Sequence, residues 1–209
     1  MLALIIGAAA VFSAPVPAMN YDWFSGVYDW PNKGVKENEP TIVSVDVTVN
    51  PYGYMQGCTA YVRRGLPELG PYVCSRLGAR AEFDPARDPA GHRMYGIFRT
   101  AIVLWYGDSQ RFPKALDTAH FKITKPVGTA APKDGALTIQ FLVDVEGHLS
   151  SCSLVPIIGY GLNKRKQEID PALAAEACTE LPLKMHPEAA RDRSGRLVPS
   201  VQTATVGVQ

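Results

Sequence analysis

Histidine and cysteine are the residue types in this 209-residue chain that most often carry metal or redox chemistry. Its four histidines, His92, His120, His148 and His186, are widely spaced and form no His-x-x-x-His or Glu-x-x-His pattern. No two of its four cysteines have the Cys-x-x-Cys spacing that is typical of zinc and redox sites. We therefore expect neither a metal site nor a cofactor.

Two further stretches contain residue types that could act in catalysis or ion binding. Residues 84–91 (Asp-Pro-Ala-Arg-Asp-Pro-Ala-Gly) are acidic, but prolines occupy positions where a calcium loop needs ligands, so we predict a stiff turn. Ser150 and Ser151 precede Cys152 without the Gly-x-Ser-x-Gly turn that exposes the nucleophile of many hydrolases. Since no catalytic set converges, we predict that the protein is not an enzyme and assign no catalytic residue.

The elements that position these residues occur twice. Residues 43–49 alternate between apolar and polar side chains, and residues 137–143 do the same 94 positions later, so both are predicted strands. Further along the spacing becomes 104, and a ten-residue insertion around residues 156–168 accounts for the change. The matches at the larger spacing are Leu69 with Leu173, Cys74 with Cys178, Leu77 with Leu181, Ala86 with Ala190, Asp88 with Asp192 and Gly91 with Gly195.

Each copy is predicted to fold as strand, strand, helix, strand. In the first copy the helix covers residues 72–77 and the last strand residues 94–105; in the second, Asp170 caps a helix that starts at Pro171. The predicted fold class is α+β: two tandem strand–strand–helix–strand modules, each a small antiparallel sheet with a helix on one face. The predicted boundaries are 1–18 for an export signal or short apolar helix, 19–40 for an aromatic segment, 41–106 for the first module, 107–134 for a linker and 135–209 for the second module.

The cysteines fall inside the two copies. Four cysteines allow three pairings, and the repeat selects Cys58 with Cys74 and Cys152 with Cys178, each joining a second strand to its helix. A disulfide would stabilise a module that is too small to bury a large core. The alternative is two pairs of reduced, buried thiols.

The first eighteen residues and the composition indicate the compartment and the class of partner. The leading run is uncharged and apolar, and it is shorter than the roughly 20 residues that a bilayer span requires. Val16 and Ala18 form the small-residue pair that signal peptidase recognises, which predicts export and cleavage before Met19. Because no Lys or Arg precedes this run, the alternative is a segment that stays attached and associates with the membrane. A net charge of +1 argues against a nucleic-acid partner.

The order and spacing of the motifs resemble the TonB C-terminal domain. In the first copy the resemblance rests on the strand and glycine turn of residues 45–53, Gly-Leu-Pro-Glu-Leu at 65–69, Phe-Asp-Pro-Ala at 83–86, and then Asp88 and Gly91. The second copy is more divergent, and the two together cover roughly 140 of the 209 residues. The second copy keeps residues 143–147, Ile169, Asp170, the helix around 175–178, Ala190, Asp192 and Gly195.

This resemblance implies a periplasmic protein that binds extended segments of outer-membrane receptors by strand addition to its last strand. Carried onto this sequence, the main binding edge is residues 95–104, and the corresponding edge of the second copy is residues 197–205, where Pro199 removes one donor. The alternative is that these edges pair with each other or with the linker. The partner-binding residues implied on the first edge are Tyr95, Ile97, Arg99, Ala101 and Val103.

The chain departs from an energy-transducing TonB protein because it has neither the full membrane anchor nor the long proline-rich spacer, so the resemblance does not extend to force transmission.

The aromatic segment repeats Tyr-Asp-Trp, and we predict that Trp23 and Trp30 dock onto a partner; the alternative is a tail packed on the first module. Two functions follow as hypotheses. The first is a binding module for receptors or envelope proteins in support of transport, and the second is a structural accessory subunit of a larger envelope membrane complex.

Overall fold

The structure is a computed structural model that describes residues 12–18, 31, 34–113, 116–132, 135–155 and 169–209. Within these ranges the chain is mostly sheet with two α-helices, in agreement with an α+β class. Its elements are β1 (Val16–Pro17), β2 (Thr41–Val49), β3 (Met55–Arg64), α1 (Leu69–Arg80), β4 (Phe83–Asp84), β5 (Ala86–Arg87), β6 (Arg93–Leu104), the 3-10 turn η2 (Ser109–Arg111), β7 (Phe121–Ile123), β8 (Ala136–Val143), β9 (Leu149–Leu154), α2 (Pro171–Lys184), β10 (Ala190–Arg191), β11 (Leu197–Val198) and β12 (Ser200–Val208).

The alternating strands of the sequence form the centre of each half of the molecule. β2 pairs antiparallel with β3 on one side and β6 on the other, and β8 pairs in the same way with β9 and β12. Period-two alternation gives each strand one buried face. The buried side chains that face the helices are Val43, Val45, Val47 and Val49 in β2 and Leu137, Ile139, Phe141 and Val143 in β8.

The two helices bury matching faces at four-residue spacing, which keeps side chains on one side of a helix. α1 is longer than the predicted helix of residues 72–77, because Pro71 is tolerated within the first turn. α2 begins as predicted, with the Asp170 carboxylate accepting a hydrogen bond from Ala172 N at 2.9 Å. The buried residues are Leu69, Val73 and Leu77 in α1 and Leu173, Ala177 and Leu181 in α2.

Equivalent turns follow β2 and β8. Asn50 Oδ1 accepts hydrogen bonds from the backbone N–H of Tyr52 and Tyr54, and Asp144 Oδ1 accepts the equivalent pair from Glu146 and His148. Each turn closes on a glycine with φ of +88°, Gly53 in one and Gly147 in the other, a conformation that residues with a Cβ rarely adopt. The two halves therefore share local turn geometry as well as element order.

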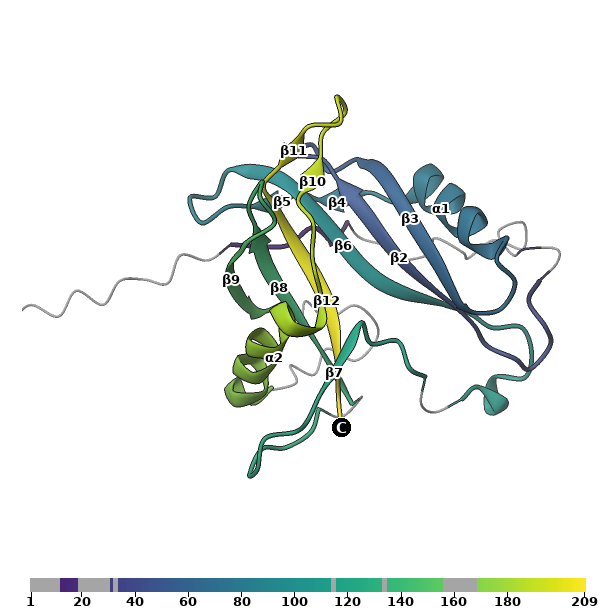
Figure 1. Cartoon of the computed structure of the whole chain (residues 1–209). Helices are drawn as coiled ribbons and strands as arrows, with labels where there is room; N and C mark the ends of the chain where they lie inside the picture. The colour runs from purple at the N-terminus through teal and green to yellow at the C-terminus, as the bar shows by residue number, and fades with distance from the viewer. Residues whose placement is uncertain (1–11, 19–30, 32–33, 114–115, 133–134, 156–168) are drawn as a thin grey trace, which may run out of the picture.

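β6 and β12 join the halves into one continuous sheet of order β3-β2-β6-β12-β8-β9, with β5 and β7 attached beside it (Figure 1). β6 and β12 run parallel, with Tyr95 opposite Ser200 and Ile97 opposite Gln202. Each module was predicted to have its own small antiparallel sheet, and the parallel pair joins the two sheets, as in the alternative in which the last strands pair with each other. β12 also begins later than predicted, because Pro199, which has no N–H, separates it from β11.

The helices cover opposite faces of this sheet. Phe98 of β6 packs into the core under α1, and Ala204 of β12 packs into the core under α2. Because Gly96 lies opposite Val201 and side chains alternate along a strand, Phe98 and Ala204 point to opposite faces. The two helices are also far apart along the sheet: Figure 1 shows α1 at one end and α2 at the other.

Two disulfides connect the outer strands to the helices. Cys58 of β3 is bonded to Cys74 of α1, and Cys152 of β9 to Cys178 of α2, which are the pairs that the repeat selects. Disulfides indicate an oxidising compartment and hence an exported protein. In the described part of the chain, no helix is both long enough and apolar enough to cross a membrane.

Candidate functional site

β6 and β12 separate after their three paired residues, and a polar cluster fills the junction. This cluster, which we call the seam, consists of Asp46 of β2, Arg99 of β6, Gln202 and Thr203 of β12, and His120 just before β7. It draws side chains from both halves and from the linker.

Arg99 is the centre of the seam, and its side chain is only 8 % exposed. Arg99 Nε donates to Asp46 Oδ2 at 2.8 Å, and Nη1 donates to Gln202 Oε1 at 2.7 Å. The Thr203 hydroxyl accepts from the Arg99 backbone N–H at 2.8 Å and donates to the Arg99 carbonyl at 3.4 Å. The Thr203 hydroxyl thus replaces the next backbone-to-backbone hydrogen bond between β6 and β12.

Gln202 is fully buried, and hydrogen bonds use both ends of its amide. While Oε1 accepts from Arg99, Nε2 donates to the Glu188 carbonyl at 2.6 Å and to Ser200 Oγ at 2.9 Å. A buried polar group is costly unless it is hydrogen-bonded, so these partners fix one arrangement of the two strands.

His120 joins the linker to β12. Its ring Nδ1 accepts from the backbone N–H of Thr205 at 2.9 Å, and the backbone N–H of His120 donates to the Thr205 carbonyl at 2.7 Å. Burial lowers the pKa of His120 to about 4; the positive charges of Arg63 and Arg99 act in the same direction, and the Asp46 carboxylate opposes them. The ring is therefore neutral at pH 7, as its role as acceptor requires.

Beyond the seam, one side of β6 has no strand partner within the described residues. The Arg99 N–H points away from β2, and alternate residues of a strand point the same way, so the N–H and C=O of Ala101 and Val103 do too. β12 does not pair with Ala101 or Val103, because from Val206 onward it pairs with β7 instead. We call the backbone of Ala101 and Val103 on this side the open edge.

The structure divides the predicted binding strand into three parts. Tyr95 and Ile97 pair with β12, so the expectation of a free edge is wrong for these two residues, and the two last strands do meet. Arg99 lies in the seam, and only Ala101 and Val103 keep an open backbone. The second predicted edge, residues 197–205, is occupied from Ser200 onward by β8 on one side and, for Ser200–Gln202, by β6 on the other. Trp23 and Trp30 lie outside the described residues.

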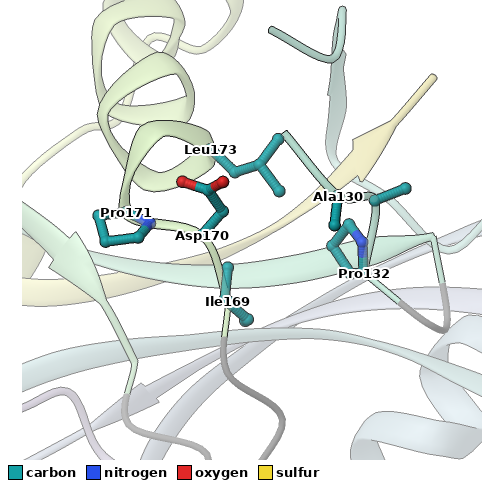
Figure 2. A pocket seen from close by; sticks show the side chains of 7 residues that line it. Ala130, Pro132, Ile169, Asp170, Pro171 and Leu173 are labelled. Carbon is teal, nitrogen blue, oxygen red and sulfur yellow. The ribbon is translucent and has the colours of Figure 1, made fainter. Parts of the chain in front are cut away.

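A pocket of about 460 Å³ lies at the N-terminus of α2. Figure 2 shows Leu173, Ala130, Pro132 and Ile169 around it, with the Asp170 carboxylate at the helix start. That carboxylate already caps the helix, and the remaining lining side chains are apolar. Among the described residues that line the pocket, Asp170 is the only one with an ionisable side chain.

The sequence analysis missed one cluster of potential metal ligands. Asp144, Glu146 and His148 bring their ligand atoms within 4.8 Å of one another in the turn after β8. The signal was their i, i+2, i+4 spacing across a turn. His148 Nδ1 lies 3.1 Å from the Asp144 carboxylate, and hydrogen bonds to His148 and Glu146 hold the pKa of Asp144 below its usual value. This network within the turn accounts for the cluster.

Removing Asp46 tests the seam. The Asp46→Ala variant leaves the buried Arg99 guanidinium without its carboxylate, and we expect the free energy of unfolding to fall by about 2 kcal/mol, less than for a fully buried pair because Asp46 is 42 % exposed. Adding Arg99→Met should restore part of this loss, because the unpaired charge is then gone. Urea denaturation of the two single variants and the double variant measures the coupling. Strictly additive effects would contradict the role given to the pair.

Comparison with protein-family models, with curated proteins and with solved structures returns no match for this chain.

Proposed function

We propose that the protein is a periplasmic, non-enzymatic binding protein made of two tandem TonB C-terminal-like modules. In this proposal it takes up extended segments of outer-membrane receptors or other envelope proteins by strand addition, in support of transport. The motif resemblance suggests this activity, and the open edge supplies a place for it.

The recurrence of one structural plan supports the tandem modules. The order strand, strand, helix, strand occurs as β2, β3, α1, β6 and again as β8, β9, α2, β12. In each half a disulfide joins the second strand to the helix, and the buried helix residues are 104 positions apart in sequence. Equivalent Asn50 and Asp144 turns follow the first strand of each half.

The open edge is the observation that carries the proposed binding. An extended peptide beside Ala101 and Val103 would accept their N–H groups and donate to their carbonyls, which continues the sheet. β12 does not cover this edge, because its residues Val206–Val208 pair with β7. The proposed site is therefore the backbone of Ala101 and Val103 and not the whole strand.

Proline at position 101 tests this proposal. Ala101→Pro removes the N–H that points away from β2 and leaves the β2 ladder intact, whereas Ala101→Val keeps the N–H and changes only the side chain. We expect the proline variant to bind its partner at least about tenfold more weakly and the valine variant to bind almost normally. The measurement is photocrosslinking in envelopes of a Gram-negative host, with a benzophenone side chain at position 103 and, as control, at exposed Tyr61.

Crosslinks from position 103 to periplasmic segments of outer-membrane receptors or other envelope proteins, lost with proline and kept with valine, support the proposal. Equal crosslinking of both variants would contradict it, provided that both unfold at the wild-type denaturant concentration.

The structural-subunit hypothesis has one observation in its favour. Because β6 and β12 lie side by side in the middle of the sheet, the two halves share one continuous sheet, and most of the predicted edges are occupied. This hypothesis expects loss of Trp23 and Trp30 to release the protein from its complex while changes at Ala101 have little effect. The crosslinking experiment therefore separates the two functions.

A further inference from the structure

The segment of residues 12–18, which we call the N-terminal strap, packs against the folded domain. Phe12 is 5 % exposed and Ala14 is 2 % exposed. Both belong to a small apolar core together with Ala86 of the first half and Val201 of the second. Two side chains this deeply buried are part of the packing of the domain.

A buried glutamine of the second half binds the backbone of the strap. Gln140 of β8 is 3 % exposed, and its Oε1 accepts from the Ala14 N–H at 2.9 Å while its Nε2 donates to the Phe12 carbonyl at 3.0 Å. A glutamine in the interior of a sheet needs such partners, because an unsatisfied buried amide costs stability. The strap supplies both.

The strap is also bound to the first half. Ser13 and Arg87 exchange two backbone hydrogen bonds of 3.0 and 2.9 Å, and β1 pairs with β4. Ala18 N donates to the Glu82 carbonyl at 2.8 Å. Gly96 of β6 leaves room for the strap, since a Cβ there would lie 2.6 Å from Pro15 Cδ. The strap thus spans from β8 in one half to β4 in the other.

We infer that residues 12–18 are retained in the mature protein as a strap that holds its two halves together, and that the chain is not cut between Ala18 and Met19. A cut there would remove Phe12 and Ala14 from the core and leave Gln140 without the two backbone partners of the strap. Processing ahead of Phe12 is compatible with every one of these contacts. The inference does not depend on the proposed binding function.

The first test is the intact mass of the full-length gene product after export, purified from the envelope of a Gram-negative host. We expect an N-terminus at or before Phe12. A mature chain that begins at Met19 would overturn the inference.

The second test compares stabilities. A chain that starts at Met19 behind a standard cleavable leader should unfold at lower urea concentration than the full chain. Gln140→Leu should lower the midpoint of the full chain but change that of the shortened chain much less, because the strap bonds exist only in the former. Equal midpoints for the full and shortened chains would refute the role of the strap.

A point variant covers the case in which the shortened chain does not fold. Phe12→Ala should lower the midpoint of the full chain clearly, whereas Phe112→Ala, which truncates a ring that is 41 % exposed, should lower it much less. Equal effects of the two phenylalanine variants would also count against the inference.

Discussion

Replacing Cys152 and Cys178 by alanine is expected to lower the free energy of unfolding by about 3.5 kcal/mol, and replacing Cys58 and Cys74 by about 3 kcal/mol. The bonds close loops of different length, because the bonded cysteines are 26 positions apart in the second half and 16 in the first. A longer loop loses more conformational entropy in the unfolded chain when it is closed. Urea denaturation at pH 7 measures both losses, with the second half as the more sensitive.

Reduction of the unmodified protein provides the control, because it opens both bonds without changing a residue. The reduced protein should be less stable than either double variant. Unfolding midpoints that do not respond to reductant would contradict the role given to both disulfides.

The features that the sequence predicted well depend on neighbouring residues. The alternation in residues 43–49 reports a strand with one buried face, and the four valines of β2 are buried as that pattern requires. The start of α2 was predictable because the Asp170 side chain reaches an N–H only two residues away. The cysteine pairs followed from the repeat, since equivalent positions in two copies take equivalent partners.

The seam was not predictable from such local signals. The pattern of residues 95–104 indicates which face of β6 is buried, but it contains no information on which strand lies beside its edge. Arg99 was expected at a free edge because the resemblance to the TonB C-terminal domain implies strand addition along residues 95–104. Its guanidinium can be buried because the Asp46 carboxylate, 53 positions away in sequence, neutralises its charge. The Gln202 side chain, 103 positions away, accepts a further hydrogen bond from it.

The N-terminal strap shows a different limit of sequence analysis. A short apolar run is expected both of an export signal and of a segment that packs on a core, so composition does not separate the two. What separates them in the structure is Gln140, which lies 126 positions from Ala14 and accepts a hydrogen bond from it. The open edge is shorter than the predicted binding strand for a related reason. Tyr95 and Ile97 pair with β12, which lies more than 100 positions away in sequence.

Acid should destabilise the protein through His120. Its pKa is about 4 in the folded state and 6.5 ordinarily, so below pH 6.5 the unfolded chain takes up a proton that the folded chain does not. Stability is therefore fully present above pH 6.5 and falls as the pH is lowered, until the folded state is protonated as well below about pH 4. The expected loss between pH 7 and pH 4 is about 3 kcal/mol.

His120→Gln isolates this contribution, because the glutamine oxygen can accept from the Thr205 N–H and has no proton to gain in this range. Carboxylates with lowered pKa values, such as Asp144 and Asp192, also weaken the fold in acid, but they are present in both proteins and cancel in the difference. The stability of the wild type relative to His120→Gln should therefore fall steadily from pH 7 to pH 4 in urea titrations. A difference that stays constant over this range would mean that His120 takes up its proton at the same pH in the folded and unfolded chains, which contradicts a buried ring that accepts the Thr205 N–H through Nδ1.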